Sequence, residues 1–587
     1  MDTIIQILAR ELGRSEAHVE NVVRLIDEGN TIPFIARYRK ELHGAMDDTA
    51  LRTLADRLQY LRNLDKRREE VKSAIEGQGK LTEELSAAID AAATLAEVED
   101  LYRPYKQKRR TRATVAREKG LEPLAELLFA QAADGPAPEE AAGAFIDPEK
   151  GVETAEDALQ GASDIIAERI SDDADIRKRL RELVWKKGYL VSAAAAKEPE
   201  DTVYRLYYAF RSPLNRVQGH QVLAINRGER EGVLKVSVEM EREAALIPVR
   251  RAVLNPGAPA MAFVRAAAED AYDRLIFPSV EREMRSLLTE QADEGAIKMF
   301  GLNLKPLLMQ PPVKGFVTMG LDPGYRNGCK VAVVDATGKV LDTAVVYPTF
   351  SQRKKEEAID TLAKLIRRHG VAHIAIGNGT ASRETEQMTV ELIKQLGGGV
   401  SYMIVNEAGA SVYSASKLAA EEFPDYDVNL RSAVSIARRL QDPLAELVKI
   451  DPKSIGVGQY QHDMPQARLD ETLSGVVEDC VNAVGVDLNT ASAPLLSYVA
   501  GLNNTTARNI VKYREENGAF TTRKGVLKVP KLGPKAFEQC AGFLRVPESR
   551  NVLDHTGVHP ESYGAAEALL APVSYTHLRA HETVLDL

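Results

Sequence analysis

The sequence FVTMGLDPGYRNGCKVAVVD, residues 316–335, decides which fold the second half of the chain is expected to adopt. It contains two runs of strand-forming residues that a short polar segment separates. Two such runs predict a β-hairpin. Pro323 has no N–H and Gly324 tolerates positive φ, so the chain is expected to turn directly after Asp322. A carboxylate at a strand end often binds a metal or steers a phosphate, but Asp322 is equally able to do no more than open the turn.

Strands and helices alternate after this hairpin. A third strand, an amphipathic helix, a short apolar strand, a second helix and a further strand are expected at GKVLDTAVVYPTF, EEAIDTLAKLIRRHG, AHIAIGN, RETEQMTVELIKQLG and SYMIVNEAG. Three adjacent strands followed by alternating helices and strands predict an α/β domain with a mixed sheet. This order resembles the ribonuclease H-like fold. The pattern GxxxxGK[ST] is absent from the sequence, so no P-loop nucleotide site is indicated.

The composition bounds the class of protein. With 587 residues the chain is too long for one hydrophobic core, and several domains are expected. Its 27% charged residues are typical of a soluble protein, and no apolar run approaches the length of a membrane span. The three cysteines lie too far apart for a zinc site or a disulfide framework, so a cytoplasmic protein without membrane contact is expected. The net charge of −9 argues weakly against bulk nucleic-acid binding, although local patches matter more.

Residues 1–195 predict a region of successive helices, and the segment 101–120 within it carries the strongest charge feature. That segment holds eight basic residues and one acid, with Tyr102 and Tyr105 among them. Basic groups neutralise phosphates and aromatic rings stack on bases, so the segment is a candidate nucleic-acid contact. The alternative is a solvated loop, or arginines that pair with the acidic residues of 97–100. The candidate contacts are Arg109, Arg110 and Arg112.

The pattern beyond residue 488 predicts two helix–hairpin–helix units. The stretches 493–518 and 526–544 each read as helix, glycine-containing hairpin and helix. The N–H groups that start the second helix of such a unit bind a backbone phosphate without reading the base sequence. Residues 501–545 hold nine basic and three acidic residues, which makes nucleic-acid contact the favoured interpretation over a purely structural pairing. The candidate contacts are Gly501, Arg508, Lys512, Lys528, Lys531, Gly533 and Lys535.

Several long motifs together resemble the bacterial transcription accessory proteins of the Tex family. The resemblance extends over about residues 1–565 and rests on motifs such as GNTIPFIARYRKE at 29–41, GLDPGYRNG at 320–328, NEAGASVYSAS at 406–416 and VHPESY at 558–563. It implies nucleic-acid binding and a role in transcription. It also implies a helical N-terminal region, a YqgF-type ribonuclease H-like domain, tandem helix–hairpin–helix motifs and a C-terminal OB-fold RNA-binding domain.

The end of the sequence departs from that family pattern. After Ala571 the chain reads PVSYTHLRAHETVLDL, which offers no strand-rich OB-fold segment and resembles translated adapter or vector sequence. The chain is therefore expected to be a truncated copy with a foreign, disordered tail at 566–587. The whole is predicted to be a multidomain, mainly α protein with one α/β domain. The expected regions are helical at 1–195, α/β-to-helical at 196–312, ribonuclease H-like at 313–450 and helix–hairpin–helix at 451–565.

The resemblance to ribonuclease H-like enzymes raises the question of catalysis. Such enzymes hold two divalent metals with clustered carboxylates. Asp322 and Glu407 fit the first two positions, but Arg431 stands where the third acid is expected, and a guanidinium cannot ligate a metal. Asp442 is a possible substitute that better fits a turn or cap. No cofactor is therefore expected, and Mg²⁺ would be needed only if the site were active.

Three interpretations of function remain open. The favoured one is a non-catalytic transcription accessory factor that binds RNA or DNA, with RNA preferred, through phosphate backbones and without strong sequence preference. The second is a metal-dependent, structure-specific nuclease of the ribonuclease H-like class. The third is an interaction scaffold whose helical N-terminal half docks a protein such as RNA polymerase.

Overall fold

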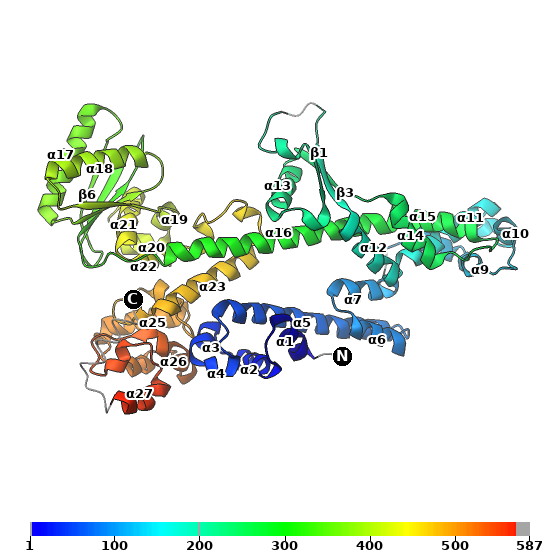
Figure 1. Cartoon of the computed structure of the whole chain (residues 1–587), viewed down its shortest axis with the longest axis horizontal. Coiled ribbons are helices and arrows are strands. Elements are labelled where there is room, and N and C mark those ends of the chain that lie inside the picture. The colour runs from blue at the N-terminus through cyan, green and yellow to red at the C-terminus, as the bar shows by residue number, and fades with distance from the viewer. Residues whose placement is uncertain (1–2, 108, 198–199, 571–587) are drawn as a thin grey trace. The chain divides into compact units, whose positions relative to one another are not determined.

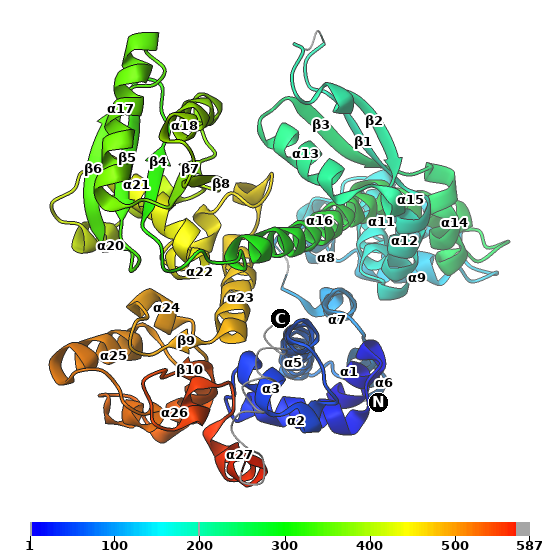
Figure 2. The same cartoon turned by 60° about the vertical axis from the view of Figure 1, so that its left-hand side comes forward.

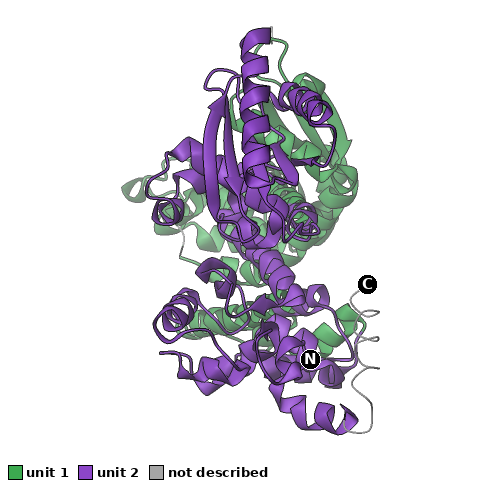
Figure 3. Cartoon of the chain, turned by 90° about the vertical axis from the view of Figure 1, so that its left-hand side faces the viewer, with its two compact units in different colours: residues 1–13, 56–296 green, residues 14–55, 297–587 purple. Residues whose placement is uncertain are grey.

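The computed structural model describes residues 3–107, 109–197 and 200–570 of the chain. The described residues divide into two compact units, one within the ranges 1–13 and 56–296 and one within the ranges 14–55 and 297–587 (Figure 3). Two long helices, α5 (Asp48–Glu76) and α16 (Phe277–Leu308), each contain a boundary between the units. Within the described ranges no helix is both long and apolar enough to cross a membrane.

The first unit is mostly helical and contains one small sheet. Strands β1 (Tyr189–Ala194), β2 (Ala209–Pro213) and β3 (Leu234–Glu239) form an antiparallel sheet in the order β2-β1-β3. Figure 1 labels β1 and β3 of this sheet. The sheet therefore begins within the expected helical region 1–195 and not after it. The helices of this unit are α1 (Ile4–Leu12), α6 (Glu83–Ala91), α7 (Leu95–Tyr102), α8 (Arg112–Glu118), α9 (Glu122–Ala130), α10 (Pro138–Gly143), α11 (Ala155–Ser171), α12 (Ala174–Lys187), α13 (Gly219–Arg230), α14 (Arg242–Val253) and α15 (Met261–Asp270).

A buried arginine joins three helices of the first unit. Arg177 on α12 is 1% exposed and donates from Nε to Asp100 on α7 over 2.7 Å. Its Nη2 donates to Ser279 and Glu283 on α16. Because a buried charge is tolerated only when it is paired and hydrogen-bonded, this cluster fixes the arrangement of the three helices.

The predicted hairpin is confirmed and forms the centre of a five-stranded mixed sheet in the second unit. Strand β4 (Thr318–Asp322) pairs antiparallel with β5 (Cys329–Val334) and parallel with β7 (His373–Gly377). Strands β6 (Val340–Val346) and β8 (Ser401–Val405) lie at the two edges, in the order β6-β5-β4-β7-β8 (Figure 2). This is the mixed α/β sheet that the sequence predicted.

Helices cover both faces of this sheet. Helices α17 (Gln352–His369) and α18 (Ser382–Leu396) bury one face with Met319, Leu321 and their neighbours. Helix α21 (Val428–Gln441) buries the other face against Ala332 and Val334. Three shorter helices complete this part of the chain: α19 (Ala410–Ala415), α20 (Lys417–Glu422) and α22 (Pro443–Leu447).

Besides the five-stranded sheet, the second unit contains helices from near the start and near the end of the chain. Helices α2 (Glu16–Asp27), α3 (Ile32–Tyr38) and α4 (Lys40–His43) belong to it, together with α23 (Gln466–Val484) and the hairpin region. The hairpin region consists of α24 (Ala493–Ser497), α25 (Asn504–Asn517), a 3₁₀ turn at Arg523–Lys528 and α26 (Pro534–Cys540), with a short parallel pair, β9 (Val486–Asp487) and β10 (Leu544–Arg545).

The expected continuous N-terminal region at 1–195 is therefore divided, because residues 14–55 pack with the C-terminal half. The Tyr38 and Phe543 rings, for example, lie 5.1 Å apart. The expected tail also begins too early, since residues 566–570 belong to helix α27 (Tyr563–Leu570). The rest of the predicted tail, 571–587, lies outside the described residues.

Because α21 lies close to β4, adding a single methyl group at Gly320 is expected to destabilise the domain. A Cβ on Gly320 would lie 2.2 Å from the backbone oxygen of Ala433 and 2.8 Å from the backbone nitrogen of Ala437. Because backbone atoms cannot rotate away, Gly320→Ala is expected to destabilise the domain by about 1–3 kcal/mol, as overpacking does. Thermal unfolding should show a lower transition temperature. Gly456→Ala, which meets no atom within 4 Å, is the matched control and should leave that temperature unchanged.

Candidate nucleic-acid interface

The first hairpin turns at Gly501, which has a left-handed φ of +78°. A Cβ at this position would lie 2.4 Å from Cβ of Gln539 on α26, so the two hairpins pack closely here. The helix that follows, α25, is capped by its own sequence. The Asn503 side chain accepts hydrogen bonds from the backbone N–H groups of Thr505 and Thr506. These N–H groups were expected to face a phosphate, but they already have an acceptor.

The second hairpin is built differently from the sequence expectation. Its left-handed residue is Lys531, with φ +66°, whereas Gly533 has φ −84° and is the N-cap of α26. The cap glycine supplies no side-chain acceptor, and Pro534 has no N–H. The backbone N–H groups of Lys535 and Ala536 form no hydrogen bond to any described residue. The second hairpin, more than the first, therefore presents donors that an anion can use.

The basic residues predicted for this surface divide into two groups. Arg508, Lys528 and Lys531 are exposed and have no ion-pair or hydrogen-bond partner in the described chain. Lys512 lies 3.7 Å from Glu516 in an exposed ion pair, which contributes little. Lys535 donates from Nζ to the backbone oxygen of Glu28 over 2.5 Å. Its head group therefore holds the end of α2 rather than lying free.

Part of the basic excess counted at 501–545 is structural. Arg523 is fully buried and donates to the backbone oxygens of Asp554, Thr556 and Val558. Arg514 likewise donates to the backbone oxygen of Leu488. Sequence counting could not separate these side chains from the exposed ones, because burial depends on contacts with residues beyond the hairpins. Lys524 is exposed without a partner among the described residues.

The basic segment 101–120 belongs to the first unit, and many of its charges are paired. Arg103, Lys106, Arg110 and Arg117 form ion pairs, with Asp172, Glu99, Glu118 and Glu168 respectively. Tyr102 and Tyr105 pack against the buried cluster around Leu64 and Val71. The two other candidates, Arg109 and Arg112, are exposed without a partner in the described ranges.

The two predicted carboxylates of the ribonuclease H-like domain lie close together. Burial and the nearby Glu407 charge raise the pKa of Asp322 to about 6, while Lys330 acts in the opposite direction. Burial also raises the pKa of Glu407. Each carboxyl group is therefore held where its charged form is disfavoured.

Two glycines make room for Glu407. A Cβ on Gly377 would lie 2.1 Å from Oε2 of Glu407, and one on Gly379 would lie 1.7 Å from Oε1. Oε2 is buried and has no hydrogen-bond partner among the described residues. Arg439 supports the same loop, since its Nη1 donates to the backbone oxygens of Asn406 and Ala408 over 2.7 and 2.8 Å.

Arg431 occupies the position at which the resemblance implies a third acidic ligand. Arg431 lies in the first turn of α21 and donates to the backbone oxygens of Phe423 and Ser414 over 3.2 and 3.3 Å. Asp442 accepts from Ala445 N and pairs with Lys314, which confirms its interpretation as a cap. In the described part of the chain no three His, Cys, Asp or Glu residues gather as a metal site.

Because the pKa of Asp322 is raised, Asp322→Asn is expected to stabilise the fold in a pH-dependent way. A carboxyl group with a folded-state pKa of about 6 destabilises the fold once pH rises through that value, and has no such effect below its unfolded pKa near 4. At pH 8 the variant should therefore unfold at a higher temperature than the unsubstituted protein. Its free energy of unfolding should be higher by on the order of 1–3 kcal/mol. The difference should disappear near pH 4. Asp360→Asn, at an exposed position, is the control, and a loss of stability in Asp322→Asn at pH 8 would contradict the prediction.

Family models match the chain in five places. The models are a Tex-like protein N-terminal domain at 2–76, a Tex central region at 134–300, a Tex protein YqgF-like domain at 316–441, a helix–hairpin–helix motif at 481–545 and an HHH domain at 551–583. The last match extends beyond residue 571. The sequence had been expected to depart from the family pattern at that point.

Relatives are similar over nearly the whole chain. An uncharacterised protein named YdcI from Bacillus subtilis (strain 168) is 52% identical, over 96% of this chain and 79% of its own length. A transcriptional accessory protein Tex from Neisseria gonorrhoeae is 48% identical, over 98% of this chain and 76% of its own length. The human S1 RNA-binding domain-containing protein 1 is 40% identical, over 92% of this chain and 56% of its own length. The identity to Tex proteins and the four kinds of matching domain lead to one conclusion: this chain belongs to the Tex family of transcription accessory proteins.

Proposed function

We propose that this protein is a non-catalytic transcription accessory factor that binds the phosphate backbone of RNA mainly through its second helix–hairpin–helix unit. The observation that supports this most directly is the group of exposed, unpartnered cations on the hairpin region, together with the open N–H groups at the start of α26. Basic side chains and helix N-termini contact phosphates without reading bases. Binding should therefore depend strongly on salt and weakly on sequence.

The preference for RNA rests on the family rather than on a contact in this chain. The name of the human relative refers to an S1 RNA-binding domain, and the Tex proteins are named for transcription. Backbone contacts at a hairpin do not by themselves distinguish RNA from DNA, since the 2′-hydroxyl is what separates them. Parallel titrations with single-stranded RNA, single-stranded DNA and duplex DNA measure the preference directly.

Neutralising two lysines of the second hairpin should weaken nucleic-acid binding and its salt dependence. Each phosphate contact that is lost removes the release of condensed counterions, so Lys528→Gln with Lys531→Gln should lower the slope of log K against log salt by about two. The slope is measured by fluorescence anisotropy with labelled single-stranded RNA over a series of KCl concentrations. Lys535 is left intact because it also contacts the Glu28 backbone.

A matched control removes two charges from another part of the same unit. Lys364 and Lys394 lie on α17 and α18, are exposed and have no partner among the described residues. Their double change to Gln should leave the slope unaltered. If the hairpin variant also leaves it unaltered while Arg109→Gln with Arg112→Gln abolishes binding, the interface lies on the basic segment 101–120 and the proposal is wrong.

The absence of nuclease activity is a separate part of the proposal. Arg431 directs its guanidinium to two backbone oxygens, and its positive charge stands where a third metal ligand would be required. The protein is expected not to cleave single strands, duplexes or four-way junctions in Mg²⁺ or Mn²⁺. Denaturing gels of end-labelled substrates provide the measurement. Metal-dependent cleavage that Asp322→Asn removes would establish the nuclease alternative.

One observation favours that alternative. Oε2 of Glu407 is buried without a hydrogen-bond partner in the described chain, and Asp322 lies near it with a raised pKa. A cation at these oxygens would relieve both conditions. The two carboxylates would hold it, and the metal would supply polarisation of a phosphate oxygen or an activated water.

A further inference from the structure

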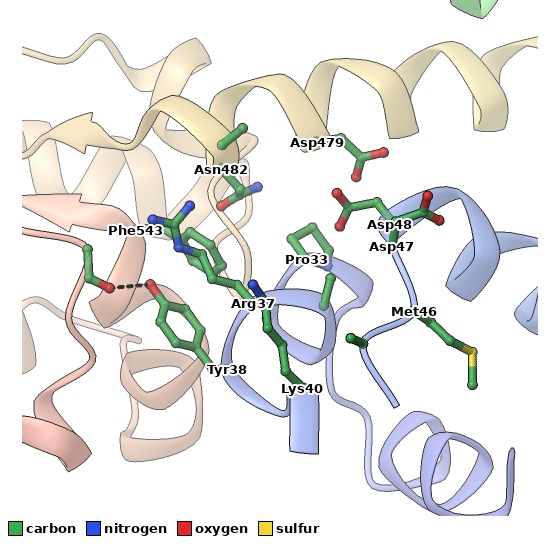
Figure 4. Close-up of a pocket in the computed structure, with 14 residues that line it drawn as sticks. Pro33, Arg37, Tyr38, Lys40, Met46, Asp47, Asp48, Asp479, Asn482 and Phe543 are labelled. Carbon is green, nitrogen blue, oxygen red and sulfur yellow. Dashed lines mark hydrogen bonds between the residues drawn. The ribbon is translucent and has the colours of Figure 1, made fainter. Parts of the chain in front are cut away.

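A pocket of 630 Å³ in the second unit has a basic and an acidic side (Figure 4). Its wall consists of the N-terminal motif around α3 and α4, the start of α5, the end of α23, and the segments near Phe543 and Gly557. Figure 4 shows Arg37 and Lys40 on one side, with Asp47, Asp48 and Asp479 on the other. The volume is within the range of pockets that hold small molecules, about 300–1,000 Å³.

The basic end is organised around Gly557. A Cβ on Gly557 would lie 2.7 Å from Nη2 of Arg37 and 3.3 Å from Nη2 of Arg545. Since both distances start from one point, the two guanidinium nitrogens lie within about 6 Å of each other, where like charges repel. Tyr38 donates its hydroxyl hydrogen to the backbone oxygen of Gly557 over 3.1 Å, which holds this segment against the pocket.

Neither arginine has a carboxylate partner in the described chain. Arg545 directs Nη1 to the backbone oxygens of Gly542 and Leu544, while its Nη2 has no acceptor there. Burial and the nearby charges of Arg523 and Arg37 lower the pKa of Arg545 to about 10. Arg545 does not itself line the pocket, but two guanidinium groups this close without a counter-ion form a place where an anion would remove the mutual repulsion.

The acids on the opposite side do not neutralise these arginines. Asp479 already pairs with Arg52, over 2.5 Å, and Asp47 accepts from the backbone N–H of Ala50 at the start of α5. Burial, together with the charges of Asp479 and Asp47, raises the pKa of Asp48. The acidic side therefore has hydrogen-bond acceptors and favours a ligand whose other end carries donors.

We propose that the end of this pocket formed by Arg37 and Gly557, beside which Arg545 lies, binds a phosphate group. Guanidinium groups match phosphate geometry with paired N–H donors, which distinguishes them from the point charge of a lysine. The phosphate belongs either to a free nucleotide, whose base would reach the acidic side, or to the end of a nucleic-acid strand. The inference is independent of the hairpin interface, because none of Arg508, Lys528 and Lys531 lines the pocket.

The test uses inorganic phosphate with the full chain. Titration calorimetry at constant ionic strength should show binding to the unsubstituted protein, and Arg37→Gln should weaken it by about tenfold, the loss of one charged contact. Arg37 is exposed, so the variant should keep its unfolding temperature. Gly557→Ala should also weaken binding, because its methyl group occupies the position 2.7 Å from Arg37 Nη2. Lys364→Gln is the control and should bind like the unsubstituted protein.

The source of the phosphate is separated by competition. Adenosine monophosphate and a single-stranded RNA with a 5′-phosphate are each titrated against bound inorganic phosphate, with a 5′-hydroxyl RNA for comparison. Displacement by the nucleotide alone identifies a free nucleotide. Displacement by the 5′-phosphate strand, and not by its 5′-hydroxyl counterpart, identifies a strand end.

Two results would overturn the proposal. The first is no phosphate binding by the unsubstituted protein, and the second is equal binding by Arg37→Gln and by Lys364→Gln. Neither result bears on the salt slope of Lys528→Gln with Lys531→Gln. Failure of the pocket and failure of the hairpin interface are therefore distinguishable.

Discussion

The arrangement of the second unit depends on one buried amide, the side chain of Gln539. This residue is 3% exposed and lies on α26. Its Oε1 accepts from the backbone N–H and the hydroxyl of Thr31, and its Nε2 donates to Asn30. Its Cβ also lies against Gly501, the turn of the first hairpin. One side chain thus joins the N-terminal motif, the first hairpin and the second hairpin. Because a buried amide must satisfy its donors and acceptors, this junction allows few alternative arrangements.

Basic residues that lie close together in the sequence therefore differ in whether their charges are accessible to a phosphate. Lys531 and Lys528 are exposed, Lys535 contacts the end of α2, and Arg523 is buried among backbone oxygens. Phosphate binding requires a charge that is accessible and lacks a partner, and only part of the basic excess meets that condition. The same docking brings Arg37 beside Gly557 and creates the basic end of the pocket.

The packing of the ribonuclease H-like domain depends on three glycines. The sheet needs Gly320 for the approach of α21, and the loop after β8 needs Gly377 and Gly379 to accommodate Glu407. Those constraints concern packing and remain whether or not a metal binds. Arg431, at the start of α21, has backbone oxygens as its partners.

The sequence by itself determined the elements that local patterns control. The hairpin at β4 and β5, the mixed sheet, the turn at Gly501 and the cap at Asp442 all follow from periodicity, turn residues and short spacings. The pattern also placed Asp322 at the end of one strand and Glu407 just after another, which is where the structure has them. Tertiary structure alone decided that residues 14–55 join the C-terminal half, that Lys531 rather than Gly533 is left-handed, and which cations are buried. Contacts across some 500 residues leave no periodic signal, since they depend on which surfaces meet after the local elements have formed.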